Sequence, residues 1–366
     1  MSRPVFGAGR VGVAELVAPI ALLALLLGTA TGAEPASRPV SWVDGAPSDA
    51  RALQLLERAS QAPATVAYHG VQFVSAWSER GSTSLVVEVD HRPGRGTTVH
   101  TAATTENPAA DTFLPADGTE PSVIGGATAL QRLDRNYTIV LAGQRWVSGR
   151  TADLVEARWP GSDHPAARFW LDAATGLVLR REVYDEQGRT TRASAFVEIV
   201  VGQPTDVQAS SVQAMPQAWS ETVDYSDRAA MEKQGWHCPD RLPGALDMVD
   251  ARRGGGAGRP ILHLSYSNGL ATVSLFEQRG RLDAANLDGY RRQEADGPAV
   301  YVRDGMPQRV VWSAQGTVFT LVADAPASTV DQVVAALPHD PVEDGGGWHR
   351  LGRGFERVAS WFNPFG

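Results

Sequence analysis

The sequence predicts a mostly β protein with two globular units, and three stretches carry that prediction. Residues 168–199 contain aromatic and β-branched runs separated by turns at 173–176 and 185–188, a pattern typical of three adjacent antiparallel strands. Two further apolar runs lie on either side of Asn268-Gly269, a dipeptide that indicates a tight hairpin. Residues 202–222 lack periodicity, so we expect the linker between the two units there.

The first 33 residues have the pattern of an export signal. Arg3 and Arg10 precede an apolar run over 16–27, and the small residues that follow fit a cleavage site after Ala33. We therefore expect an extracytoplasmic protein that is exported by a signal peptide. Because no charge interrupts the segment from 16 to 33, an uncleaved membrane anchor is the alternative.

The first unit is expected at 48–201, after a linker at 34–47 that is rich in Pro, Ser and Ala. A helix should begin at Ser48, which we predict to be its N-cap. Residues 102–126 predict a long excursion with one edge strand, because they are rich in Ala, Thr, Pro, Asp and Gly. A second short helix is expected at 127–133, and further strands are expected at 65–74, 84–90, 97–101, 137–141 and 151–159.

The second unit is expected at 223–340. After the Asn268-Gly269 hairpin, β-branched runs predict strands at 299–303, 308–313 and 317–323. A helix should follow from Pro326 and Ser328 and end before Pro338, which cannot continue it.

Short motifs in the first unit resemble, in their order along the chain, the N-terminal domain of the MucB/RseB family. They are a hairpin with a Gly-Arg pair, a Trp-Leu-Asp triplet and a Thr-Gly turn, over about 50–200 of the chain. Ser148 departs from the small residue that usually precedes the Gly-Arg pair. The motif residues are Gly149, Arg150, Trp170, Leu171, Asp172, Thr175 and Gly176. The resemblance implies a LolA-like antiparallel half-barrel with covering helices, followed by a small antiparallel sheet with a helix.

The same resemblance implies a function. The MucB/RseB family comprises extracytoplasmic regulators that bind membrane-anchored anti-sigma factors. A member would shield its anti-sigma factor from proteolysis and release it when a lipid or a mislocalised lipoprotein occupies the half-barrel. The alternative is a LolA-like carrier of lipid or lipoprotein without a regulatory role. A carrier needs only one self-sufficient domain, so the second unit favours the regulator.

Six aromatic residues are candidates for lining a lipid cavity in the first unit. One hypothesis places them on a sheet face that an acyl chain could occupy, and the other places them in a core filled against the helices. We expect a curved sheet of eleven strands that one or two helices cannot fill. Phe169 and Trp170 are adjacent in a strand, so they point to opposite faces and only one can line the cavity. The six are Phe73, Trp77, Phe113, Tyr137, Phe169 and Trp170.

The composition argues against several other functions. The formal net charge of −8 and the absence of a dense basic stripe disfavour nucleic-acid binding, which needs clustered cations. The eight histidines are dispersed and Cys238 is the single cysteine, so we expect no metal site, no cofactor and no disulfide. No nucleophile elbow or zinc-protease motif occurs, and an enzyme is therefore the least favoured class.

The C-terminal tail, 341–366, has the pattern of a basic amphipathic helix. Apolar residues recur there at helical spacing, while Arg350, Arg353 and Arg357 lie off that stripe. Such a helix docks on a partner, lies peripherally on a membrane or packs on its own domain, and the sequence leaves these options open. The apolar stripe is Leu351, Phe355, Val358 and Phe362.

Overall fold

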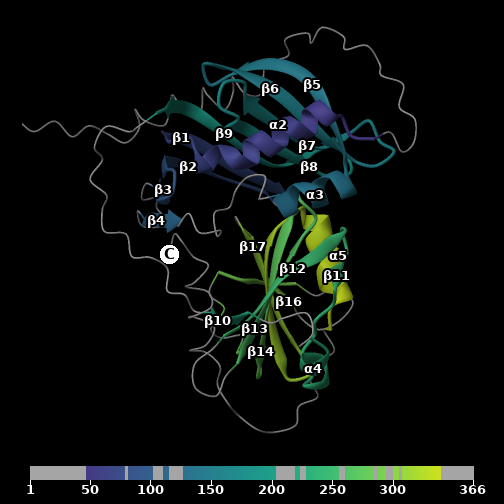
Figure 1. Ribbon diagram of the computed structural model, residues 1–366. Helices are drawn as coiled ribbons and strands as arrows, with labels where there is room; N and C mark the ends of the chain where they lie inside the picture. Colours follow the sequence, from purple (N-terminus) through teal and green to yellow (C-terminus); the bar gives the residue numbers. More distant parts are fainter. Residues whose placement is uncertain are drawn as a thin grey trace, which may run out of the picture. The chain divides into compact units, whose positions relative to one another are not determined.

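Two open antiparallel sheets make up most of the computed structural model (Figure 1). All described residues lie in the compact unit 44–366. They are 47–78, 81–101, 110–114, 127–202, 219–222, 228–254, 260–283, 287, 289–293, 300–304 and 307–338.

The first sheet has nine strands among the described residues, in the order β4-β3-β2-β1-β9-β8-β7-β6-β5. Every pairing is antiparallel. Strands β1 and β9, which are far apart in the sequence, pair with each other in the middle of the sheet. The strands are β1 (Tyr68–Ser78), β2 (Gly81–Arg92), β3 (Gly96–Thr101), β4 (Ala110–Leu114), β5 (Thr138–Val147), β6 (Arg150–Arg158), β7 (Pro165–Asp172), β8 (Val178–Tyr184) and β9 (Thr190–Val201). The predicted meander is confirmed as β7-β8-β9, and the predicted edge strand as β4.

Helix α2 (Ala50–Gln61) lies across one face of the first sheet and contacts β5, β6 and β7 (Figure 1). Its buried face, which includes Leu55 and Leu56, joins Phe169 and Ile139 in one apolar cluster. A short 3-10 turn, η1 (Ala62–Ala64), follows α2, and α3 (Ala127–Asn136) contributes Leu133 to the same cluster. Burial of this apolar surface is what holds the helices on the sheet.

The second sheet also has nine described strands, eight of them in the order β10-β12-β13-β14-β18-β17-β16-β15, with β11 paired to β12. Helix α5 (Ala327–Ala336) buries Val330 and Val333 in the apolar cluster of this sheet, and α4 (Arg228–Lys233) adds Met231. The strands are β10 (Trp219–Thr222), β11 (Arg241–Leu242), β12 (Leu246–Gly254), β13 (Ile261–Ser267), β14 (Thr272–Arg279), β15 (Arg291–Gln293), β16 (Val300–Arg303), β17 (Gln308–Ala314) and β18 (Thr317–Asp324).

The predicted fold class, mostly β with two antiparallel sheets and covering helices, is confirmed. Two details were wrong. The first sheet has nine described strands where we expected eleven. The N-cap of α2 is Asp49, whose carboxylate accepts hydrogen bonds from the N–H groups of Arg51 and Ala52. The Ser48 hydroxyl accepts instead from the Ile139 N–H at 3.0 Å, so it ties the helix entry to β5.

Candidate functional site at the junction of the two sheets

The turn between β13 and β14 of the second sheet contacts elements of the first sheet, α3 and β8. Within this turn the Asn268 side-chain oxygen accepts from the N–H groups of Leu270 and Ala271 at 2.9 and 2.8 Å. Its side-chain amide donates to the Gly244 carbonyl, and its own carbonyl accepts from Asn136 at the end of α3. Residues from the elements around both sheets therefore supply the hydrogen-bond partners of Asn268.

Gly269 is required at the tip of this turn for two reasons. Its φ of +97° lies in the left-handed region, which side-chain-bearing residues rarely adopt. A Cβ at this position would also lie only 2.7 to 2.9 Å from the backbone and Cβ of Leu133 in α3. The hairpin signal in the sequence therefore marks a place where two backbones approach closely.

Leu270, the next residue of the turn, packs into the core of the first sheet. It is 7% exposed and belongs to the apolar cluster of Leu133, Phe169 and Val183. Its carbonyl accepts a hydrogen bond of 2.8 Å from the Arg181 guanidinium of β8. A side chain of the second sheet thus completes the core of the first.

Two arginines of the first sheet, Arg181 and Arg192, contact the second sheet at the junction. Burial lowers the pKa of Arg181, the nearby Asp324 carboxylate opposes that effect, and the positive charge of Arg192 adds to it. Arg192 of β9 pairs with Asp324 at the end of β18 and also donates to the Ala323 carbonyl. Arg135 of α3 forms a further ion pair with Asp247 of β12.

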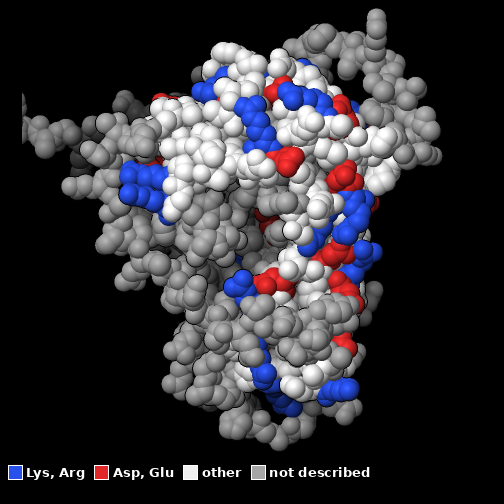
Figure 2. Space-filling model, in the orientation of Figure 1, with Lys and Arg blue, Asp and Glu red and all other residues white. Residues whose placement is uncertain are grey.

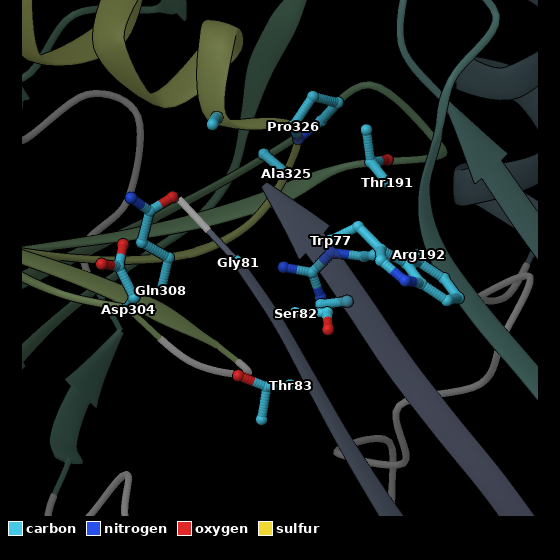
Figure 3. A pocket seen from close by; sticks show the side chains of 12 residues that line it. Trp77, Gly81, Ser82, Thr83, Thr191, Arg192, Asp304, Gln308, Ala325 and Pro326 are labelled. Atoms are coloured by element: carbon cyan, nitrogen blue, oxygen red, sulfur yellow. The ribbon is translucent and has the colours of Figure 1, made fainter. Parts of the chain in front are cut away.

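Two small cavities adjoin this contact, and Arg192 lines both of them. The larger cavity, of about 200 Å³, has Trp77 and Arg192 on one side and Asp304 and Gln308 on the other (Figure 3). The smaller one, of about 60 Å³, is lined by Tyr137, Tyr184 and Leu270, among others. Both are smaller than the roughly 300–1,000 Å³ of ordinary ligand pockets.

The structure divides the six predicted cavity residues among different places. Trp77, which is 40% exposed, lines the larger cavity, and Tyr137, which is buried, lines the smaller one. Phe169 lies in the core beneath α2, at 1% exposure. Phe73 is half-buried in β1. Phe113 lies in β4, but its side chain is outside the described residues.

Trp170 packs on the face of the sheet opposite to Phe169, as the strand alternation predicts. It belongs to a small cluster with Ala152, Leu154 and Leu179, and the Arg180 guanidinium lies 4.9 Å from its ring centroid. Because α2 covers the other face, any ligand beneath α2 would contact Phe169 and not Trp170. The lipid cavity itself stays a prediction.

The motif residues form a network that joins two turns of the first sheet. The Arg150 guanidinium binds both carboxylate oxygens of Asp172, at 2.8 and 3.0 Å. Asp172 also accepts from the N–H and the hydroxyl of Thr175. Burial raises the pKa of Asp172, but the bonds from Arg150 and Thr175 outweigh it and hold that pKa below its usual value. Gly149 and Gly176 adopt φ values of +74° and +83°, and Leu171 is buried.

The charged residues of the described surface are mixed in sign on the face seen in Figure 2. Within the described part of the chain no group of three His, Cys, Asp or Glu side chains is placed to hold a metal ion. Cys238 is buried in the core of the second sheet. The predicted tail residues Leu351, Phe355, Val358 and Phe362 lie outside the described residues.

Sequence reasoning missed the residues that make the junction. Arg181 and Arg192 look like ordinary arginines of a basic strand, and Leu270 looks like the first residue of the next strand. The Asn268-Gly269 pair was a recognisable signal, but it predicts a turn and not what the turn contacts.

Comparisons with known proteins agree with this architecture. Residues 97–218 match the family model of the MucB/RseB N-terminal domain, which confirms the resemblance found in the sequence. A crystal structure of MucB is 20% identical, with a TM-score of 0.50, and the match covers 79% of this chain and 98% of that chain. At this identity the match shows the fold alone.

Two related structures have lower TM-scores. A crystal structure of MucB in complex with MucA(peri) is 19% identical with a TM-score of 0.47, and the match covers 80% of this chain and 100% of that chain. The Pseudomonas aeruginosa MucA/MucB complex is 21% identical with a TM-score of 0.46, and the match covers 80% of this chain and 100% of that chain. No curated protein matches the chain significantly. In the described residues, no helix has both the length and the apolarity that crossing a membrane requires.

Proposed function

We propose that this protein is an extracytoplasmic, non-enzymatic regulator that binds the outer segment of a membrane-anchored anti-sigma factor and responds to lipid or lipoprotein. The observation that carries the proposal is the match of residues 97–218 to the MucB/RseB N-terminal domain. The second sheet supports the regulator over the plain carrier, because a carrier has no need of a second unit whose Leu270 completes the core of the first.

The junction offers a route by which a ligand would weaken partner binding. Ligand control requires that the partner prefer one of two states, because equal affinity for both shifts nothing. The cavities of about 200 and 60 Å³ are too small for an acyl chain, so a lipid has to displace packed side chains. In our proposal it displaces Leu270 from beside Phe169, which frees the second sheet from the first.

The partner part of the proposal is tested with the exported chain, residues 34–366. A single-span protein encoded next to this one would be the anti-sigma candidate, and its outer segment is titrated calorimetrically against the purified chain. We expect saturable binding that weakens when a fatty acid is added. Absence of binding to the neighbouring single-span protein would remove the regulator and leave the carrier as the better candidate.

The coupling part is tested with Leu270→Ala and a matched control, Leu242→Ala. Leu242 is likewise buried, at 3% exposure, but it lies in the core of the second sheet. If lipid competes with Leu270, Leu270→Ala binds a fluorescent fatty acid more tightly and the partner more weakly. Leu242→Ala should change neither affinity. An isolated first unit is a poor substitute for this test, because it loses Leu270 from its core.

Export is tested separately, because the proposed partner is reachable only outside the cytoplasm. The motivation is the basic and apolar pattern of residues 1–33. A reporter enzyme that works only outside the membrane, fused after Gly366, should be active. An inactive reporter, with the fusion protein found in the cytoplasm, would exclude every extracytoplasmic function.

A further inference from the structure

Four of the seven most exposed large apolar side chains in the described residues lie on three adjacent strands of the first sheet. Trp77 of β1 is 40% exposed, Val86 of β2 is 42% exposed, and Val197 and Val200 of β9 are 46% and 45% exposed. Scattered apolar residues are normal on a surface, but a cluster on neighbouring strands marks a contact site.

The strand register places Trp77, Val86 and Val200 on one face, whereas Val197 lies at an irregularity of β9. Phe73 lies opposite Val86 on one side and Ala195 on the other, and residues directly opposite in antiparallel strands point the same way. The next residues in sequence on β2 and β9, Val87 and Phe196, are buried on the other face. The apolar face is therefore the one turned away from the core.

Two exposed carboxylates lie within this surface. Val71 lies opposite Glu88 of β2 and Glu198 of β9, and both glutamates are exposed. In the next row Asp90 is paired with Arg92, at 3.2 Å, so it adds little charge. We call this surface the acidic-apolar face. It consists of Val71, Phe73, Val86, Glu88, Glu198 and Val200.

The chemistry of the acidic-apolar face selects its occupant. Glu88 and Glu198 repel the anionic headgroups of a membrane surface, whereas they attract a segment that carries both apolar and basic side chains. Residues 348–366 of this chain are such a segment, with Leu351 and Phe355 on an apolar stripe and arginines beside it.

The tail is also long enough to reach this face. Residues 339–350, twelve in number, separate the last described residue from the apolar stripe and span up to roughly 40 Å when extended. The first residue of α5, Ala327, lines the same cavity as Trp77 and Thr83. The end of α5 is about 15 Å further along the helix, and Val86 lies three residues beyond Thr83, about 10 Å.

We propose that residues 348–366 dock in cis on the acidic-apolar face, with their apolar stripe on Phe73 and Val86 and their arginines on Glu88 and Glu198. The contact shields the exposed strand surface of the first sheet. It does not depend on the anti-sigma partner proposed above.

The first experiment uses a chain that ends at residue 340, which retains α5 and the Pro338 carbonyl that accepts from Trp312. A fluorescein-labelled synthetic peptide, 345–366, is titrated against it by fluorescence anisotropy. We expect saturable binding to this chain. Residues 34–366 should bind the peptide at least tenfold more weakly, because the attached tail competes at a high effective concentration.

The location is tested by reversing charges. Glu88→Arg together with Glu198→Arg should weaken peptide binding roughly tenfold, whereas Glu57→Arg, at an exposed position on α2, should leave it unchanged. Circular dichroism checks that each variant is folded. Two results would overturn the proposal. One is that Glu57→Arg weakens peptide binding as much as the double charge reversal does. The other is that residues 34–366 bind the peptide as tightly as the chain that ends at residue 340.

The intact protein provides an independent measurement. Phe355→Ser with Phe362→Ser in residues 34–366 should increase binding of a hydrophobic fluorescent dye to the level of the chain that ends at 340. Vesicles containing phosphatidylglycerol serve as the competing occupant. A peptide that binds these vesicles and not the protein identifies a membrane-docking tail and refutes docking in cis.

Discussion

Glu277 should make the stability of the second sheet depend on pH near neutrality. It is 1% exposed in β14, where it lies opposite Leu262 and Phe319 of the neighbouring strands. One carboxylate oxygen accepts from the His237 N–H at 2.9 Å, and the other has no hydrogen-bond partner within the described part of the chain. Burial raises the pKa of Glu277 to about 7, against the opposing effects of that bond and of the Arg279 charge.

The size of the effect follows from the difference between the folded and unfolded pKa values. The ordinary value is 4.5, so a folded value of about 7 corresponds to roughly 3 kcal/mol of differential stability. The folded chain binds the proton more tightly, so this contribution is fully present below pH 4.5. It is lost as the pH rises through 7, and it changes little above that.

The assay compares the wild type with Glu277→Gln by urea denaturation at pH 5, 6, 7 and 8. The glutamine is neutral at every pH, and its side-chain oxygen still accepts from His237. The unfolding free energy of the wild type relative to the variant should therefore fall by about 2–3 kcal/mol between pH 5 and 8. A difference that stays constant over this range would refute the reasoning and show that Glu277 is not protonated in the folded chain.

Three further predictions concern the first sheet and its junction. Gly269→Ala should lower the unfolding free energy by at least about 1 kcal/mol, measured by thermal unfolding, because the added Cβ meets Leu133 at under 3 Å and the φ is left-handed. Asp172→Ala should lower the unfolding free energy by about 1–3 kcal/mol in urea titrations, because the partly exposed Arg150 guanidinium and the Thr175 N–H lose their acceptor, and no change would mean that solvent replaces the carboxylate. Trp170→Ala should lower the unfolding free energy by about 3–5 kcal/mol and leave the fatty-acid affinity unchanged, because Trp170 lies on the face that α2 does not cover. A loss of that affinity would place the lipid site on the Trp170 face.

The elements that sequence reasoning predicted well are those whose signals are local. The meander at 168–199 and the hairpin at Asn268-Gly269 depend on alternation and on turn residues a few positions apart, and both are present. The N-cap was wrong for an instructive reason. Ser48 and Asp49 are both good capping residues, and β5 decides between them, because the Ile139 N–H donates to the Ser48 hydroxyl and Asp49 is left to cap the helix. That strand lies about 90 residues away in the chain.

The candidate site could not be predicted because none of its members has a distinctive neighbourhood in the sequence. Leu270 lies in a turn that the Asn268 side chain stabilises locally, yet its own side chain is buried against Leu133 and Phe169 of the other sheet's core. This arrangement explains why the turn must be tight. A longer loop would satisfy the connection between β13 and β14 equally well, but it would not bring Gly269 into backbone contact with α3. The tight turn is thus better explained by the junction than by the hairpin.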